Sequence, residues 1–196
     1  MSKNPMYFLL NYVKPNYCKR PPLLLINYIN MPYIYDGVFI PKTNAVNMPY
    51  FDILLDITTL GLFSLIMNDP NSTFQSGNTI HWVIVNITPV NGLYSDNTIL
   101  PGITIHGNPL YGKIIQLIIH PDISYLENYI GPQPPINSGI HKYVFTLYGQ
   151  NSNKITYTGP IPIFDSQKTL LSKLQLSVKQ KITSLYFVSS YYSVVA

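Results

Sequence analysis

IHWVIVNI at residues 80–87 and GIHKYVFTLY at residues 139–148 are the two stretches that decide the fold. Each places a histidine in a run of aromatic and β-branched residues, a composition typical of strands. The chain has only four histidines. Because two of them occupy equivalent places in the two clearest strands, we expect them to line a shared pocket.

Further strands are expected on both sides of these stretches. They are short runs of aromatic and branched residues bounded by turns with glycine, proline or asparagine. These runs occupy residues 49–57, 60–68, 155–163 and 185–195, with residues 113–119 as a strand or a helical turn. Loops rather than regular helices separate them, which favours an antiparallel or mixed sandwich over a doubly wound sheet.

One segment, residues 165–182, has helical character. Its leucines recur at helical spacing among lysines, and Asp165 or Ser166 can cap its start. Prolines exclude long helices from the first forty residues, so residues 1–44 are expected to wrap the core in extended form. The sequence therefore predicts a mostly β single domain, residues 1–196, with one helix near its C-terminus.

Composition limits the class of protein and its location. Charged residues make up 10% of the chain, where about 25% is usual, and 17 tyrosines and many asparagines supply polarity instead. This bias is not that of a disordered chain, and it suggests an AT-rich genome such as that of a large DNA virus. Cys18 is the sole cysteine, so no intrachain disulfide can form. We expect a cytoplasmic protein, in the host cytoplasm or the virion if the source is viral.

The distribution of charged and apolar residues argues against nucleic-acid binding and against a membrane span. The net charge is +4, but the twelve basic residues are thinly spread. Their densest zone, residues 168–181, fits the solvated face of a helix, and no nucleic-acid motif accompanies it. No apolar run approaches the roughly 20 residues of a membrane span. Neither nucleic-acid binding nor a membrane span is expected.

Four polar side chains could form a cleft. Alternation along a strand puts His141 and Tyr143 on one face, His81 begins the earlier strand, and Asp69 is held at a turn by Pro70. If these loops converge, the cleft suits a phosphate or carboxylate, because imidazole N–H and phenol O–H groups donate hydrogen bonds.

Each histidine also has an interpretation in which it has no role in ligand binding. Either His81 or His141 alone would be read as a satisfied core histidine, and only their combination with Asp69 favours a pocket. His106 and His120 are expected in loops, without metal-ligand spacing, so we expect no metal or other cofactor. No G-x-S-x-G nucleophile elbow is present, which indicates that the protein is not an enzyme.

The order of these motifs resembles that of the phosphatidylethanolamine-binding protein family, which includes the Raf kinase inhibitor proteins. The matching motifs are Asp69-Pro70, His81-Trp82, GPQPP at residues 131–135 and GIHKY at residues 139–143. The resemblance implies a large central sheet, a smaller flanking sheet and a pocket for phosphate or phosphorylated head groups. It implies a ligand-binding set of Asp69, His81, Gly131, Pro135, His141 and Tyr143.

The chain also departs from the family pattern. Asn71 stands where the family has a second aspartate, Gln133 where it has a rim glycine, and Lys142 where arginine is commoner. Residues 88–128 form a long inserted connection. The missing carboxylate makes the predicted pocket less acidic, whereas Gln133 could partly fill it.

The resemblance implies a binding protein, monomeric or homodimeric, rather than an enzyme. Its ligand would be phosphate, a phosphorylated small molecule or a lipid head group, and its protein partner a kinase or protease that it regulates. The alternative is a structural or interaction protein with a vestigial pocket, in which residues 88–128 make the contacts. Asn71 and Gln133 argue for this alternative.

Overall fold

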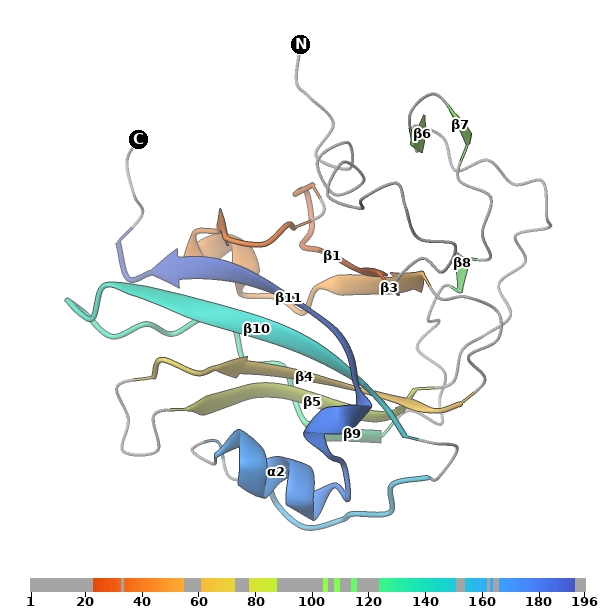
Figure 1. The fold of residues 1–196 in the computed structure, drawn as a ribbon. Coiled ribbons are helices and arrows are strands. Elements are labelled where there is room, and N and C mark those ends of the chain that lie inside the picture. The colour runs from red at the N-terminus through yellow and green to blue at the C-terminus, as the bar shows by residue number, and fades with distance from the viewer. Residues whose placement is uncertain are drawn as a thin grey trace.

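A six-stranded sheet forms the centre of the molecule (Figure 1). The computed structural model describes residues 23–32, 34–54, 61–72, 78–87, 104–105, 108–109, 114–115, 124–150, 154–161, 163 and 166–192. In spatial order the sheet comprises β2 (Val38–Phe39), β11 (Lys181–Ser190), β10 (Ile140–Gly149), β4 (Phe63–Asp69), β5 (Thr79–Ile87) and β9 (Ser124–Glu127). Only the β2–β11 pair is parallel, so the sheet is mixed.

The remaining described elements are smaller. A second sheet contains β1 (Leu23–Asn27), β3 (Tyr50–Leu54) and β8 (Ile114–Ile115), and a two-stranded ladder joins β6 (Thr104–Ile105) to β7 (Asn108–Pro109). The helices are the 3₁₀ turns η1 (Lys42–Ala45) and η2 (Val178–Gln180) and the α-helix α2 (Gln167–Lys173). The predicted fold class is confirmed: a mostly β protein with a large mixed sheet, a smaller sheet and a helix near the C-terminus.

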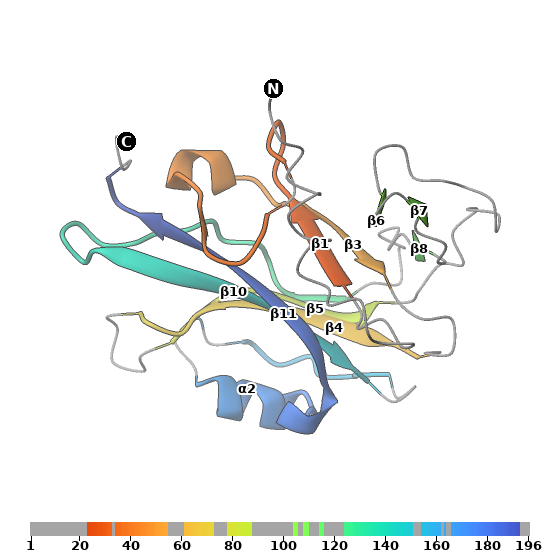
Figure 2. The ribbon, with the colours of Figure 1, turned by 45° about the horizontal axis from the view of Figure 1, so that its top comes forward.

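The central sheet is covered by β1 and β3 on one face and by α2 on the other (Figures 1 and 2). Alternation along β4 sends Leu65 and Met67 into the core beneath β1 and β3, and Ile66 into the core beneath α2. Leu170 and Leu171 of α2 pack in that second core. Every residue of β4 and β5 is consequently buried, which explains why these strands read as nearly continuous apolar runs.

The C-terminal helix is shorter than predicted. Ser166 caps α2 as expected, its Oγ accepting a hydrogen bond from the Thr169 N–H at 3.1 Å. The helix ends at Lys173 because Gln175 takes a left-handed conformation, with φ of 55°. The prediction of a helix to residue 182 was wrong, and the closing strand begins at Lys181 rather than at residue 185.

One predicted strand is absent, and other predicted segments lie outside the described residues. The described residues 154–161 and 163 form no strand, so the strand predicted for residues 155–163 was wrong. Residues 1–22 of the predicted N-terminal wrap, and most of the predicted connection at residues 88–128, lie outside the described residues. The wrap, the inserted connection and the single-domain organisation remain predictions. Within the described part of the chain, no helix is long and apolar enough to cross a membrane.

Candidate functional site

Strand direction brings the predicted polar residues to one end of the central sheet. Asp69 is the last residue of β4, whereas His81 and His141 lie near the starts of β5 and β10. Because β4 runs antiparallel to both neighbours, its end lies beside their beginnings. All three side chains are buried.

These side chains line a cavity of about 210 Å³. Five of the six predicted ligand-binding residues lie around it, namely Asp69, His81, Pro135, His141 and Tyr143. The other lining residues are Ser72, Thr79, Ile80, Ile130, Gln133 and Ile163. The cavity therefore combines a few convergent polar groups with apolar walls, as small-ligand sites commonly do.

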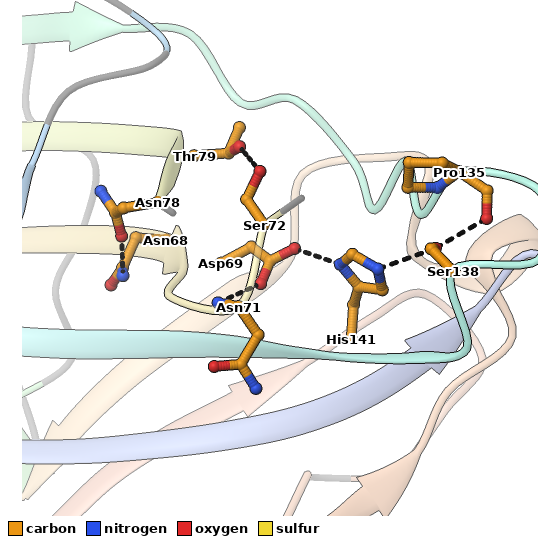
Figure 3. A network of polar contacts seen from close by, with 9 residues as sticks. All are labelled: Asn68, Asp69, Asn71, Ser72, Asn78, Thr79, Pro135, Ser138 and His141. Carbon is orange, nitrogen blue, oxygen red and sulfur yellow. Dashed lines mark hydrogen bonds and ion pairs between the residues drawn. The ribbon is translucent and has the colours of Figure 1, made fainter. Parts of the chain in front are cut away.

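His141 is held at both ring nitrogens (Figure 3). Its Nδ1 lies 2.6 Å from Asp69 Oδ2, and its Nε2 lies 2.8 Å from Ser138 Oγ. The Ser138 hydroxyl donates its one hydrogen to the Pro135 carbonyl at 2.7 Å, so its Oγ accepts from Nε2. Both nitrogens of His141 therefore donate, and the ring is an imidazolium paired with the Asp69 carboxylate.

The other oxygen of Asp69 is also bonded within the fold. The Asn71 backbone N–H donates to Asp69 Oδ1 at 2.9 Å, closing the turn after β4. In Figure 3 the Asn71 side-chain amide points away from that carboxylate. Asn71 thus supports Asp69 through its backbone, although it lacks the second carboxyl group of the family pattern.

His81 is fixed in a single neutral form. Its Nδ1 lies 3.0 Å from the Ile130 carbonyl oxygen, and the Ile130 N–H donates back to the His81 carbonyl at 2.8 Å. Burial lowers the pKa of His81, and the Ile130 carbonyl and the Asp69 charge only partly offset this. The ring is therefore neutral near pH 7, with its proton on Nδ1.

Tyr143 lines the cavity and packs against His81. Its ring meets the His81 ring edge to face at 5.1 Å and stacks on Phe187 at 5.2 Å. Burial, with the Asp69 charge, raises the pKa of Tyr143, and a hydrogen bond from the Gln133 backbone partly offsets that rise. The phenol keeps its proton at neutral pH.

Gly131 is the one predicted site residue that does not line the cavity. A Cβ there would lie 2.7 Å from the Ala45 carbonyl oxygen and 3.2 Å from Val46 Cα. The absence of a side chain lets the loop pack against η1. Its contribution is to loop position, with Pro135 reaching the cavity instead.

Sequence reasoning did not find Ser138 or the Ile130 carbonyl. Ser138 had a detectable sequence signal, because the flanking Asn137 and Gly139 are residues that favour a tight turn next to His141. In the structure both have positive φ, 62° and 82°. The Ile130 carbonyl had none, since a backbone oxygen is independent of residue type. No group of His, Cys, Asp or Glu within the described ranges could hold a metal ion.

Residues 39–189 match the family model described as phosphatidylethanolamine-binding protein. The chain belongs to this family. Its fold is similar to a carboxypeptidase Y inhibitor crystallised with its cognate proteinase, with a TM-score of 0.60 and 20% identity over 96% of this chain and 93% of that one. It is also similar to the phosphatidylethanolamine-binding protein from Plasmodium vivax, with a TM-score of 0.55 and 12% identity over 96% and 95% of the two chains.

A curated relative is the "Putative lipoprotein LppC" of Mycobacterium tuberculosis. It is 29% identical over 85 residues, which is 43% of this chain and 34% of that protein. The match therefore spans about a third of the relative's length. At these identities the solved structures show a shared fold and no more.

Proposed function

We propose that this protein is a non-enzymatic binding protein whose cavity captures a phosphorylated ligand. The observation that carries the proposal is the convergence of His81, His141 and Tyr143 on one cavity, with an imidazolium fixed by Asp69. A buried imidazolium favours an anion nearby, and a protonated phenol can donate to it. Family membership supports the same class of ligand.

The neighbouring carboxylate limits the strength of this attraction. Asp69 balances the charge of His141, and His81 is neutral near pH 7. The named polar groups of the cavity therefore sum to about zero charge. We expect a modest affinity for free phosphate, with further contacts from the rest of a larger ligand.

Ser138, His141 and Asp69 resemble a hydrolytic triad in spacing, yet their hydrogen bonds oppose that role. A nucleophilic serine must give its proton to the histidine. Here Ser138 donates to the Pro135 carbonyl, and His141 Nε2 donates to Ser138. Ser138 is also absent from the cavity lining. This arrangement supports binding rather than catalysis.

A protein partner, such as a protease or kinase, is the second part of the proposal. The support is the fold similarity to an inhibitor crystallised with its cognate proteinase. The cytoplasmic location and viral source remain predictions, and the curated relative is itself a putative lipoprotein. The alternative of a vestigial pocket remains open to the experiment below.

Isothermal titration with phosphate and phosphoethanolamine tests the proposal. His141→Gln removes the cation from the cavity and should weaken binding about tenfold or more, the usual effect of losing a charged partner. Lys142→Gln is the matched control, because Lys142 lies over the Tyr186 ring, outside the cavity lining, with 3.8 Å from its Nζ to the ring centroid.

The control should leave affinity within about twofold of wild type. If the wild-type protein bound neither compound, or if both variants lost affinity equally, the pocket would be vestigial. Shortening the segment at residues 88–128 would then be the next test for lost partner binding.

A further inference from the structure

His81 offers the cavity a hydrogen-bond acceptor. A carbonyl oxygen can only accept, so the 3.0 Å contact between Nδ1 and Ile130 O assigns the proton to Nδ1. In a neutral imidazole the other nitrogen, Nε2, then carries a lone pair. Since Nδ1 is taken and His81 lines the cavity, Nε2 is the ring nitrogen left for a ligand.

Tyr143 offers a donor. The Gln133 backbone supplies a hydrogen bond to the phenol oxygen, and this leaves the phenol proton for another acceptor. Both ring N–H groups of His141 donate within the fold, to Asp69 and Ser138, so His141 contributes only its charge to ligand binding. The ligand therefore meets one lone pair and one donor rather than a set of donors.

We infer that the cavity selects oxyanions that carry their own proton, such as a phosphate or phosphomonoester monoanion, over fully deprotonated oxyanions such as sulfate. The P–OH group donates to His81 Nε2, while an unprotonated oxygen accepts from Tyr143. A fully deprotonated anion would place lone pair against lone pair at Nε2 in a buried site, where an unpaired acceptor is unfavourable. This inference rests on the anion binding proposed above.

The charged and polar groups around His81 act on its pKa in opposite directions. Asp69 faces it from β4, His141 and Tyr143 face it from β10, and the loop side presents the Ile130 and Gly131 backbone. Burial is the largest effect and lowers the pKa of His81, as does the charge of His141, whereas the Ile130 and Gly131 backbone and the Asp69 charge raise it without cancelling the shift. Acidification below that pKa would convert Nε2 into a donor, so the preference for a protonated anion should shrink at low pH.

Titration of the full chain with inorganic phosphate and with sodium sulfate tests the inference. Near pH 7 every inorganic phosphate ion carries one or two protons while sulfate carries none, and we expect phosphate to bind at least about tenfold more tightly. At a second, lower pH, below the lowered pKa of His81, sulfate should gain affinity relative to phosphate as His81 gains its second proton.

His81→Gln is the decisive variant, because its amide presents both an N–H and a carbonyl near the position of Nε2. The phosphate-to-sulfate ratio should fall toward one while phosphate still binds. Lys142→Gln should leave the ratio unchanged. Tyr143→Phe provides a second variant, since it should weaken both anions and keep their ratio, and thermal unfolding verifies that each variant is folded.

The outcomes separate the two proposals. Equal binding of sulfate and phosphate near pH 7, or a ratio unaffected by His81→Gln, would overturn the selectivity while leaving anion binding intact. Binding of neither anion at either pH would overturn anion binding itself, and the selectivity with it.

Discussion

Gly131 lies so close to the backbone of η1 that it has no room for a side chain. The atoms that a methyl group would meet, Ala45 O at 2.7 Å and Val46 Cα at 3.2 Å, belong to the backbone and cannot rotate away. This packing sets the position of the loop whose Ile130 carbonyl holds His81 and whose Pro135 reaches the cavity.

Gly131→Ala should therefore lower the free energy of unfolding by about 1–3 kcal/mol, the usual effect of forcing extra volume into a packed site. Gly139→Ala is the control. Nothing lies within 4 Å of a Cβ there, and only its φ of 82° is unfavourable, so it should lower stability by about 1 kcal/mol. Chemical denaturation measures both, and a smaller effect at Gly131 than at Gly139 would contradict the packing argument.

At the residue scale, the sequence predicted the polar side chains of the site but not the contacts that hold them in position. Asp69, His81 and His141 could be grouped because strand alternation and motif order constrain them. Their partners depend on contacts that no local pattern encodes. The approach of Gly131 to η1 and the bond from His81 to a carbonyl oxygen both arise from packing between distant segments.

Among the elements, β5 and β10 are joined at their far ends by a buried polar network. Gln150 Oε1 accepts from the Asn86 backbone N–H and from Ser64 Oγ, each at 2.7 Å, and Gln150 Nε2 donates to Asn86 Oδ1 at 2.9 Å. Asn86 Oδ1 also accepts from the Ile155 N–H, and Asn86 Nδ2 donates to the Ile155 carbonyl. The network anchors the segment after β10 to the end of β5.

Gln150→Leu should lower the free energy of unfolding by about 2–4 kcal/mol, because it leaves the buried Asn86 N–H and the Ser64 hydroxyl without their hydrogen-bond acceptor. Ser64→Ala removes a single hydroxyl from the same network and should lower stability by about 1 kcal/mol. Urea denaturation of both variants provides the comparison. Equal losses would show that Gln150 contributes only the one bond.

The same network explains one wrong prediction. The run at residues 155–163 has the composition of a strand, but the Ile155 backbone pairs with the Asn86 side chain instead of with another strand. The predicted end of the C-terminal helix was wrong for a comparable reason. The helical spacing of leucines continues past the true end of α2, and this spacing does not reveal the left-handed conformation of Gln175.

On the scale of the whole molecule, three layers place the cavity at one end of a sheet that is covered on both faces (Figures 1 and 2). The long apolar runs of β4, β5 and β10 made the mostly β class predictable. The spatial strand order and the parallel pairing of β2 with β11 were not predictable from local patterns, because they depend on contacts between segments far apart in the chain.

Global stability should depend on pH through His81. Its pKa in the folded protein is lowered, so the unfolded chain binds the proton more readily. Stability from this residue is present above the ordinary histidine pKa of about 6.5 and is lost as pH falls toward the folded value. Unfolding free energies of wild type and His81→Gln should therefore converge or cross on acidification from near pH 7. Parallel pH profiles would show that His81 is not responsible.

Asn86 has one more consequence, which concerns modification. With Ile87 and Thr88 it forms an acceptor sequence for N-linked glycans. In the folded protein its amide nitrogen donates to Ile155, and only 3% of the residue is exposed. A sugar could join that nitrogen only before β5 took its place, and it would then displace Ile155. In a secretory compartment, glycosylation and folding would compete for the same amide.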